Sequence, residues 1–419
     1  MVKDPKGRKR VVVTGIGAIA PVGLNADEYW QNLVAGKSGI DKITLFDASD
    51  LSCKIAGEVK GSDPLQYIDR KTARHMARFT QFAVAAGKMA IDDAELDLDK
   101  EDRDRIGMII GNGIGGLPNM QEQCNILETR GGMRVTPFFM TITLANMAAS
   151  QISIHFGLKG YTSTTVTACA AGTQAIGEAA EIIRQGKCDI MVTGGTEAGI
   201  TGIGVAGFCT MKALTTNNEV PAKASRPFDA NRDGFIPGEG AGILILESLE
   251  HALNRGANIL CEVVGYGCSA DAHHVTAPEP NGAGMARGMK AALDDAFLTT
   301  TDVDYINAHG TSTPLNDVTE TRAIKRLFEG YAYKIPISST KSMIGHLLGG
   351  SGGAEAVAVV KTIVEGVIHP TINYETADAE CDLDYVPNTA RKKQVKVAMS
   401  NSFGFGGQNA CLILKAYEQ

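Results

Sequence analysis

The sequence lacks several features that would place it in common classes of protein. No apolar run approaches the roughly 18 residues of a membrane-spanning helix. Basic residues do not predominate: 40 Lys and Arg stand against 47 Asp and Glu, for a formal net charge of −7. A nucleic-acid-binding protein would normally carry a basic face. No Pro/Ser-rich tract marks a linker. We therefore expect a globular protein whose main partner is neither nucleic acid nor membrane.

The nine cysteines show no Cys-x-x-Cys pair and no regular spacing. This pattern is typical of a reduced, cytoplasmic protein whose cysteines are small core hydrophobes. We expect that role for eight of them: Cys53, Cys124, Cys188, Cys209, Cys261, Cys268, Cys381 and Cys411. No zinc site is expected, because His273 and His274 have no second pair of ligands at metal spacing. The basic segment 1–10 is expected to be a solvated tail, since it lacks the apolar core of a signal peptide.

Strand-like and helix-like segments alternate along the whole chain. Apolar strands, many ending in glycine, are expected at 10–17, 105–113, 188–195, 242–247, 260–267, 304–310, 335–340 and 396–404. Helical spacing occurs at 67–94, 175–186, 281–296, 317–330 and 352–366. Apolar strands with helices between them predict an α/β protein whose strands are buried on both faces. A faint repeat of strand, helix and glycine-rich strand predicts two similar halves, 1–255 and 256–419.

Two glycine patterns suggest dinucleotide binding, and we reject both. Residues 15–20 and 111–116 each follow a predicted strand. The dinucleotide fingerprint needs a helix that begins inside the glycines, so that its first amides meet the pyrophosphate. Pro21 breaks the first candidate and Pro118 weakens the second. A nicotinamide-dependent dehydrogenase is therefore disfavoured.

One cysteine lies in an unusual context. In residues 165–174, TVTACAAGTQ, Cys169 stands where a strand rich in β-branched residues turns into a helix. The small residues Ala170, Ala171 and Gly172 leave room around its sulfur. At a helix N-terminus the pKa of a thiol falls from about 8.5 into the range of about 3.5–7.5, because the helix dipole stabilises the thiolate. A thiolate in this position is a candidate nucleophile that accepts an acyl group.

Further ionisable residues follow other predicted strands. His309 stands in NAHGTSTPLND, at the strand edge where α/β folds bind ligands. A histidine with no functional role, on the surface or in the core, is an equally good interpretation of this position. Lys341 and His346 follow the strand 335–340, and Glu355 lies in a very apolar helix. Charged side chains in such an apolar environment are unfavourable unless they pair with one another. The alternative interpretation of Lys341 is an ordinary surface lysine. One thiol, two histidines and one lysine can thus converge at one edge of the sheet.

Two phenylalanines lie among glycines in NSFGFGGQNA, residues 401–410. Phe403 and Phe405 either cap an apolar pocket or fold back into the core. A glycine-rich loop of this kind moves easily. The backbone amides of Cys169 and Phe405 are candidates for an oxyanion hole.

Six motifs occur in order: VTGIGAIAPVG, VTACAAG, SRPFDANRDGFIPGEGAG, NAHGTSTPLND, STKSMIGHLLGGSGG and NSFGFGGQNA. With them the chain resembles the elongating β-ketoacyl–acyl carrier protein synthases of the thiolase superfamily, most closely the type II synthases of bacterial fatty-acid synthesis. The resemblance runs from about Arg10 to the C-terminus. It implies a thiolase-like five-layered αβαβα fold of two pseudo-repeated halves, and a homodimer. It also implies a decarboxylative Claisen condensation of an acyl-cysteine enzyme with malonyl-acyl carrier protein, without metal or organic cofactor.

The resemblance also implies roles for individual residues. Cys169 is expected to carry the acyl group, and His309 and His346 to bind the malonyl thioester carbonyl and promote decarboxylation. Lys341 is expected to support His346, with Glu355 as its buried partner. Further expected residues are Thr276, Thr311 and Thr313 for the phosphopantetheine arm, Phe405 as gate, Ile114, Phe208 and (across a dimer) Phe139 for the acyl pocket, and Lys71, Arg74 and Lys212 for carrier-protein docking. Gln408 departs from the threonine usual in the family, which concerns loop packing rather than chemistry.

Three related activities are alternatives to this one. A degradative thiolase or an initiating synthase is disfavoured, because the initiating type carries asparagine where this chain has His346. A non-catalytic chain-length partner of a polyketide synthase is disfavoured by Cys169, which such subunits have lost. A polyketide or specialised-lipid ketosynthase with the same chemistry stays open, because the motifs around the site are common to both pathways.

Overall fold

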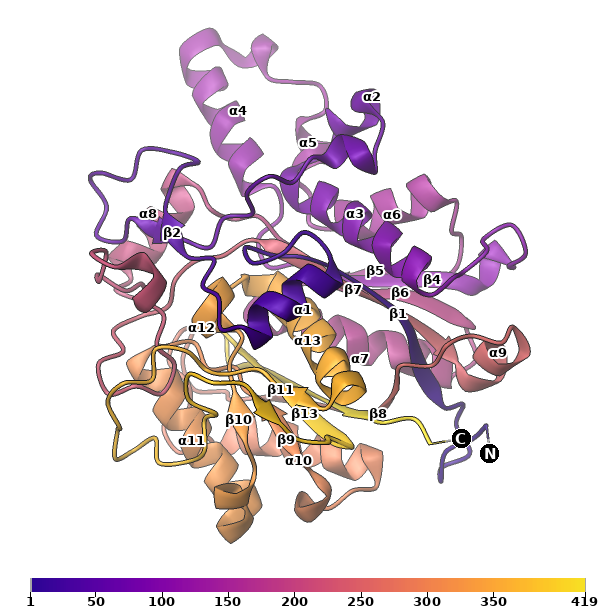
Figure 1. Cartoon of the computed structure of the whole chain (residues 1–419). Helices are drawn as coiled ribbons and strands as arrows, with labels where there is room; N and C mark the ends of the chain where they lie inside the picture. The colour runs from indigo at the N-terminus through magenta and orange to yellow at the C-terminus, as the bar shows by residue number, and fades with distance from the viewer. Residues whose placement is uncertain (1, 419) are drawn as a thin grey trace.

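Ten strands form one mixed sheet in the computed structural model, which describes residues 2–418 (Figure 1). Along the sheet their order is β10-β9-β13-β14-β8-β1-β7-β6-β4-β5. Their bounds are β1 (Val11–Ile19), β4 (Ile106–Gly111), β5 (Thr162–Thr165), β6 (Ile190–Glu197), β7 (Gly240–Ser248), β8 (Cys261–Ala270), β9 (Tyr305–Asn307), β10 (Ile337–Ser338), β13 (Val397–Gly404) and β14 (Gln408–Lys415). Two small sheets pair β2 (Asp41–Lys42) with β3 (Ile55–Ala56) and β11 (Val367–Ile368) with β12 (Arg391–Lys392).

The large sheet consists of two halves with the same strand order. The order β5-β4-β6-β7-β1 in the first half corresponds to β10-β9-β13-β14-β8 in the second. In each half the outer pair is parallel and the glycine-rich strand pairs antiparallel with the next. The halves meet where Val12 and Val13 of β1 pair with Glu262 and Cys261 of β8. The repeat that is faint in the sequence is thus distinct in the topology.

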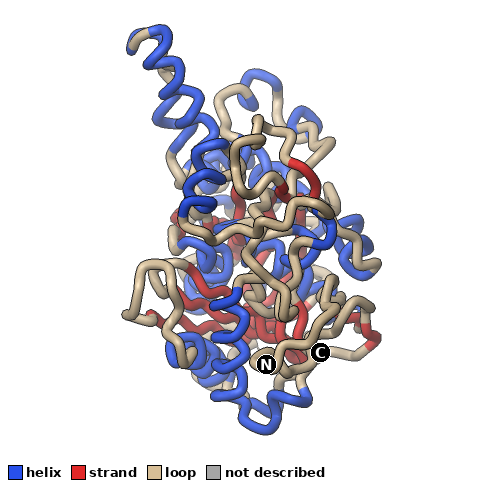
Figure 2. Tube along the Cα trace, turned by 90° about the vertical axis from the view of Figure 1, so that its left-hand side faces the viewer, coloured by secondary structure: helices blue, strands red, loops and turns tan. Residues whose placement is uncertain are grey.

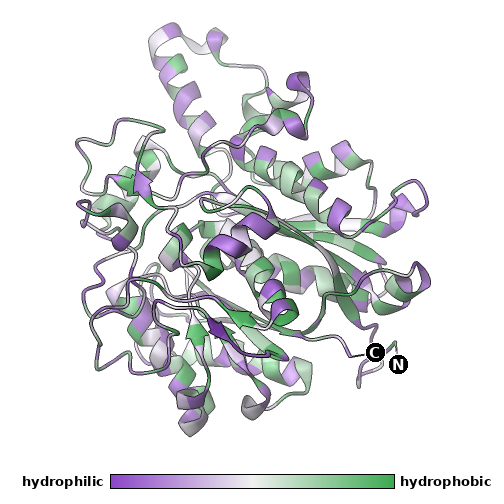
Figure 3. Cartoon of the chain, viewed as in Figure 1, coloured by the Kyte–Doolittle hydropathy of each residue, from purple (hydrophilic) through white to green (hydrophobic). Residues whose placement is uncertain are grey.

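The helices form three layers around the two half-sheets. In the middle lie α7 (Ala171–Arg184) and α13 (Ser351–Glu365), each of which contacts strands of both halves. The helices α3 (Arg78–Asp93) and α6 (Met147–Phe156) cover the outer face of the first half, and α10 (Ala283–Ala296), with α11 (Pro314–Phe328) beside it, covers the second. The predicted five-layered thiolase-like fold is therefore confirmed. Figure 3 shows the apolar strands and middle helices enclosed by more polar outer elements.

The remaining helices lie at the periphery, except for the short α12 (Lys341–Ile344), whose four residues are all buried. The peripheral helices are α1 (Ala26–Val34), α2 (Arg70–Ala73), α4 (Leu117–Arg130), α5 (Phe139–Thr143), α8 (Gly202–Thr210) and α9 (Leu249–Asn254). Of these, α4 projects from the body of the molecule, as Figures 1 and 2 show from two directions. Over residues 2–418, none of the helices has both the length and the apolar character needed to cross a bilayer.

The first glycine pattern serves strand–helix packing. β1 continues through Gly15 and Gly17 to Ile19 without a helix start. A Cβ atom at Gly17 would lie 2.1 Å from the carbonyl oxygen of Ala86 in α3, and one at Gly15 would lie 2.3 Å from that of Ala90. The glycines allow α3 to approach the sheet closely, which agrees with the rejection of a dinucleotide site here.

Several local predictions were wrong. The expected helix 67–94 is divided into α2 and α3, because Asp69 accepts backbone N–H bonds that start a separate helix and Ala77 is extended. The expected strand 335–340 contains only Ile337–Ser338. In segment 1–10, of which residue 1 lies outside the described residues, Arg8 donates to Asp4 at 2.6 Å and Asp295 at 2.7 Å. This segment is therefore held against the body rather than being a free solvated tail.

The expectation that eight cysteines lie in the core holds for only five of them. Cys124 and Cys268 are exposed and Cys209 is half-buried. The remaining Cys53, Cys188, Cys261, Cys381 and Cys411 are buried.

Candidate active site

Cys169 lies in a short 3₁₀ turn, Ala168–Ala170, between β5 and α7. Ala168 has a φ of +50°, a left-handed conformation that is strained for a residue with a Cβ atom. This sharp turn places the thiol at the wall of a cavity of about 480 Å³. The strand-to-helix position predicted for Cys169 is thus observed.

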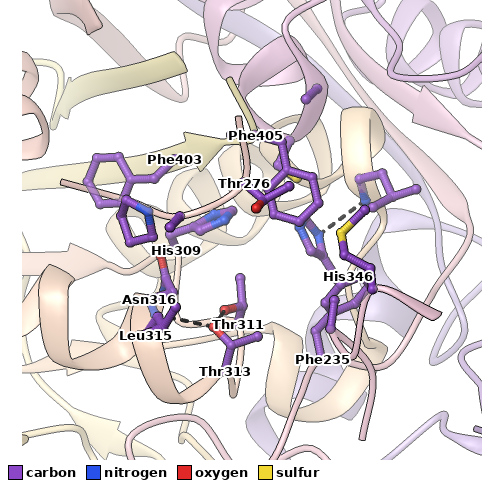
Figure 4. A pocket seen from close by; sticks show the side chains of 18 of the residues that line it. Phe235, Thr276, His309, Thr311, Thr313, Leu315, Asn316, His346, Phe403 and Phe405 are labelled. Atoms are coloured by element: carbon purple, nitrogen blue, oxygen red, sulfur yellow. Dashed lines mark hydrogen bonds between the residues drawn. The ribbon is translucent and has the colours of Figure 1, made fainter. Parts of the chain in front are cut away.

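The cavity has a polar side and an apolar side. Thr276, Thr311, Thr313 and Asn316 provide hydroxyl and amide groups on the polar side, and the hydroxyls of Thr311 and Thr313 lie 2.9 Å apart (Figure 4). The apolar side is formed by Ile114, Phe208, Phe235 and Leu348, which belong to the same hydrophobic cluster as Cys169. This division suits a ligand with a polar arm and an apolar chain that meet at the thiol.

His309 and His346 converge on Cys169 from two different loops. One ligand atom from each of the three residues lies within 4.8 Å of the others. The two imidazole rings are nearly perpendicular, with centroids 5.3 Å apart, and both face the cavity (Figure 4). Residues far apart in the sequence therefore form one compact group.

Hydrogen bonds define the state of His346. The backbone N–H of Leu348 donates to its Nδ1 at 3.1 Å, and the hydroxyl of Ser351 lies 2.9 Å from the same atom. Because Nδ1 accepts a proton donor, it carries no proton, and the neutral ring holds its proton on Nε2. The Nδ1 atom of His309, in contrast, is buried without a hydrogen-bond partner within residues 2–418. No hydrogen bond within the described residues therefore fixes the position of the proton on His309.

Both imidazoles are neutral near pH 7. Burial lowers the pKa of His309 well below its usual value, and the positive charge of Lys341 and the neighbouring His346 ring lower it further. Burial and the charge of Lys341 likewise lower the pKa of His346. The pair therefore offers neutral N–H donors rather than charged acids.

Lys341 lies behind the cavity and contacts Glu355. Both side chains are 1% exposed, and the ammonium group forms an ion pair with the carboxylate. Ser402 donates to the other oxygen of Glu355 at 3.5 Å and lies 2.7 Å from the hydroxyl of Thr173. The buried lysine supplies a positive charge that affects all three reactive side chains without lining the cavity.

The predicted low pKa of the Cys169 thiol was wrong. Burial raises its pKa to about 11, although the charge of Lys341 and the backbone N–H groups of Phe405 and Cys169 lower it in part. The loss of hydration outweighs the partial charge of the helix N-terminus. The same two amides lower the pKa by stabilising negative charge at the sulfur, as the donors of an oxyanion hole beside the nucleophile would do.

The other predicted site residues fall into three groups. Thr276, Thr311, Thr313, Ile114, Phe208, Phe405 and Lys212 all line the cavity with Cys169. Lys71 and Arg74 are exposed at α2 and just after it. Phe139 is half-buried in α5 and does not line this cavity. Of the two loop phenylalanines, Phe403 is buried beside His309, whereas Phe405 is half-buried at the cavity wall.

Sequence reasoning missed three buried carboxylates. Glu320 accepts the backbone N–H groups of His309 and Gly310, both at 2.8 Å, and so holds the histidine loop. Asp317, one helical turn earlier in α11, accepts the N–H of Thr311 at 3.1 Å. Glu197 ends the buried strand β6. Glu355 was recognised in the sequence because it is an acidic residue in an apolar helix. Glu197, an acidic residue at the end of an apolar strand, could have been recognised in the same way.

Comparison with known proteins agrees with this geometry. The model of the β-ketoacyl synthase N-terminal domain matches residues 8–252, and that of the β-ketoacyl synthase C-terminal domain matches residues 260–375. The chain belongs to the β-ketoacyl synthase family. The predicted resemblance is thereby confirmed, and this β-ketoacyl synthase is an acyltransferase.

Relatives of this β-ketoacyl synthase match over nearly its whole length. The 3-oxoacyl-[acyl-carrier-protein] synthase 2 of Synechocystis sp. is 54% identical over 411 residues, which covers 98% of this chain and 99% of that protein. The protein of the same name from Staphylococcus aureus is 50% identical over 410 residues, with the same coverage.

Solved structures of other synthases are similar to this one. A β-ketoacyl synthase from Burkholderia phymatum has a TM-score of 0.91 at 38% identity, covering 98% of this chain and 100% of its own. A type II polyketide ketosynthase in complex with its acyl-carrier protein has a TM-score of 0.91 at 36% identity, with the same coverage.

Proposed function

We propose that this β-ketoacyl synthase elongates fatty acids by condensing an acyl group on Cys169 with malonyl-acyl carrier protein, giving 3-oxoacyl-acyl carrier protein. The observation that carries the proposal is the group of Cys169, His309 and His346, within 4.8 Å of one another in a cavity with a polar and an apolar side. The high identity to 3-oxoacyl-[acyl-carrier-protein] synthase 2 proteins supports it.

In the first half-reaction Cys169 takes the acyl group from acyl carrier protein. The sulfur attacks the thioester carbonyl, and the amides of Cys169 and Phe405 stabilise the oxyanion that forms. His309, whose Nδ1 has no other partner within the described chain, accepts the thiol proton. The proton then passes to the carrier thiol as the carbon–sulfur bond of the donor breaks. A thiol that stays protonated until substrate arrives is protected from unwanted reactions.

In the second half-reaction the two histidines act on malonyl-acyl carrier protein. Loss of carbon dioxide leaves an electron pair that moves onto the thioester oxygen, and the N–H groups of His309 and His346 stabilise that charge. The carbon of this enolate attacks the acyl carbonyl on Cys169. The cysteine leaves as thiolate and takes up one proton from solvent, which balances the proton passed to the first carrier thiol. Neutral donors suit this step, because they stabilise the enolate without protonating its carbon.

The acyl carrier protein and its phosphopantetheine arm contact two further groups of residues. The threonines Thr276, Thr311 and Thr313 hold the phosphopantetheine arm at the polar side of the cavity. The exposed cations Lys71, Arg74 and Lys212 receive the acidic carrier protein. The chemistry needs no metal and no organic cofactor, since the donors described above stabilise the charges that develop.

We propose that the enzyme acts as a homodimer in the cytoplasm. β5 ends the sheet and has a free edge, and large apolar side chains are exposed around it and on the projecting α4 region: Leu127, Met133, Met140, Ile154, Tyr161 and Val166. Exposed apolar surface of this kind is typical of an interface. Pairing through this face would bring Phe139 toward the partner's acyl pocket.

The dimer is tested by sedimentation. Ile154 is 71% exposed, so Ile154→Glu costs a monomer little but places a charge within the proposed interface. We expect a dimer for the wild type and monomer for this variant. A monomeric wild type at micromolar concentration, or a variant that stays dimeric, contradicts the proposal.

The function is tested by separating the two half-reactions. Cys169→Ala should abolish condensation but retain malonyl decarboxylation, because the enolate-stabilising donors remain. His309→Ala and His346→Ala should each lower decarboxylation by ~10²–10³-fold, yet leave part of the acyl transfer to Cys169. Radiolabelled acyl transfer and carbon dioxide release, measured on all three variants, decide the matter. A cysteine variant without decarboxylation, together with a histidine variant that decarboxylates normally, contradicts this division of roles.

A second candidate function is condensation in a polyketide or specialised-lipid pathway. The similarity to the type II polyketide ketosynthase favours it. A polyketide synthase extends chains that still carry 3-oxo groups, whereas fatty-acid elongation uses reduced chains. Competition between saturated acyl and 3-oxoacyl donors for Cys169 distinguishes them: preference for saturated donors supports fatty-acid elongation, and preference for 3-oxoacyl donors supports the alternative.

A further inference from the structure

Glu197 is a buried carboxylate beneath the apolar side of the cavity. It ends β6, opposite Gly240 of β7, and is 0% exposed. Its Oε2 accepts the backbone N–H of Gly113 at 2.8 Å and that of Gly349 at 3.2 Å. Its Oε1 accepts from the side-chain amide of Asn112 at 3.2 Å. One carboxylate thus binds two loops that are far apart in the sequence.

These two loops carry opposing walls of the cavity. Gly113 precedes Ile114, and Gly349 follows Leu348; both apolar side chains line the cavity with Cys169. They approach one another above Gly199, where an added Cβ atom would lie 3.4 Å from Ile114 Cδ1 and 3.8 Å from Leu348 Cδ1. Glu197 therefore holds in place the two side chains between which an apolar chain on Cys169 would pass.

The hydrogen bonds around Glu197 require an ionised carboxylate. Asn112 also donates to Thr196 O at 2.7 Å and accepts the N–H of Gly115 at 2.6 Å, so its amide cannot turn over. At least three N–H donors therefore point at the two carboxylate oxygens. A glutamine would present an N–H group to at least one of these donors, and a protonated carboxyl group would add a proton that finds no acceptor among them.

The ionisation of Glu197 falls near neutral pH. Burial raises its pKa to about 7. Hydrogen bonds from the backbone N–H groups of Gly113, Gly349 and Ile114 and from the side-chain amide of Asn112 lower the pKa and so offset part of this effect. The titratable group that its charge is seen to affect is Cys169, whose pKa it raises. Gly240 and the residues that bind the carboxylate have no ionisable side chain.

We propose that Glu197 is a positioning residue that sets the acyl-chain selectivity of the cavity, by holding the loops of Ile114 and Leu348 at a defined separation. This inference rests on the proposed acyl transfer to Cys169. When the carboxylate is ionised the two walls are held, and the cavity discriminates between acyl chains. When it is protonated one of the hydrogen bonds is lost and the discrimination is relaxed.

The test compares two matched buried glutamates, each of which binds two backbone N–H groups. The rate of acylation of Cys169 is measured by rapid-quench mass spectrometry with a series of acyl-acyl carrier proteins of increasing length. A hydrophobic pocket distinguishes one methylene group by roughly tenfold or more. We therefore expect Glu197→Gln to relax the discrimination between acyl chains, so that the long-to-short rate ratio moves about tenfold toward one. Malonyl decarboxylation should be retained. Glu320→Gln, which disturbs the histidine loop, should lower decarboxylation and leave the ratio unchanged.

The wild-type enzyme provides a test that does not depend on folding of a variant. Ionisation of the thiol and the imidazoles acts on all acyl donors alike and cancels in the rate ratio. In the wild type, the discrimination between chain lengths that this ratio measures should increase as pH rises from 6 to 8, through the pKa of about 7 of Glu197. In Glu197→Gln the ratio should not change with pH. A flat wild-type ratio, or an equal loss with all chain lengths in the variant, overturns the inference. Failure of Cys169 to accept any acyl group would instead overturn the proposed function.

Discussion

At the scale of single residues, burial controls the chemistry of the site more than local sequence does. Cys169 has the small neighbours and helix N-terminus of a reactive cysteine, yet burial keeps its pKa near 11. The histidines are neutral for the same reason. The thiol and the two imidazoles are therefore neutral at rest, and charge develops on them only when substrate supplies the electrophile.

The raised thiol pKa predicts the pH dependence of alkylation. Since only the thiolate reacts, the rate of Cys169 alkylation by iodoacetamide should increase about tenfold per pH unit from pH 7 to 10. Peptide mass spectrometry distinguishes Cys169 from the exposed Cys124 and Cys268, and Cys169→Ala provides the blank. A rate that reaches a plateau below pH 8 would show that the thiol pKa is low, as the sequence alone suggests.

The Lys341–Glu355 pair predicts a large effect on stability. Lys341→Ala leaves the buried Glu355 without its counter-charge, which costs about 3–5 kcal/mol for a buried pair. Equilibrium urea unfolding measures the loss. Lys290→Ala is the control, because its ion pair with Asp294 is exposed, at 57% and 61%, and such pairs contribute little. Equal effects of the two substitutions would contradict the assignment of a dehydrated pair.

At the scale of elements, the loop between β13 and β14 connects Phe405 to the polar side of the cavity. Gly406 and Gly407 have φ values of +80° and +70°, which favour glycine. The N–H of Gly406 donates to Val275 O at 2.8 Å, and Gly407 O accepts the N–H of Asp271 at 2.9 Å. Movement of Phe405 would therefore be coupled to the segment that carries Thr276.

This loop predicts a gating role for Phe405. An acyl group on Cys169 should displace the ring, and Phe405→Ala should slow condensation or disturb the order in which the two carriers bind. Steady-state kinetics with both carriers measures the effect. Gln408→Thr, at the end of the same loop but outside the cavity lining, serves as control and should have little effect. A crystal structure of the acylated enzyme with the ring unmoved would refute the prediction.

At the scale of the whole molecule, local charge matters more than net charge. The chain is acidic overall, at −7, but Lys71 and Arg74 are exposed and Lys212 is exposed at the cavity. Charges at the rim of an interface mainly set encounter rate and salt sensitivity. We therefore expect these three exposed cations to steer an acidic carrier toward the enzyme, despite its negative net charge.

The proposed docking of the carrier protein on Lys71 and Arg74 predicts a selective kinetic defect. The double variant Lys71→Glu/Arg74→Glu should raise KM for acyl carrier protein while sparing acyl transfer from a small thioester. Lys290→Glu/Arg326→Glu, in a separate groove lined by α10 and α11, is the control with the same charge change. Equal losses with carrier-bound and small donors, or equal losses in both double variants, would remove the assignment.

The sequence by itself determined the α/β class, the strand-to-helix turn at Cys169 and the candidate residues His309, His346 and Lys341. These follow from local patterns: apolar periodicity, small residues around a thiol, and charges entering an apolar helix. The family motifs extended this to the thiolase-like arrangement of two halves. Most of the candidate residues indeed lie around one cavity.

Only the tertiary structure decided the ionisation of the site and the supports behind it. The thiol pKa was misjudged because it depends on how completely distant segments exclude water from the sulfur. Glu320 and Glu197 were missed because their partners are backbone N–H groups of loops that the sheet brings to them from elsewhere in the chain. Local patterns show which groups are present, whereas desolvation and convergence depend on packing between segments remote in sequence.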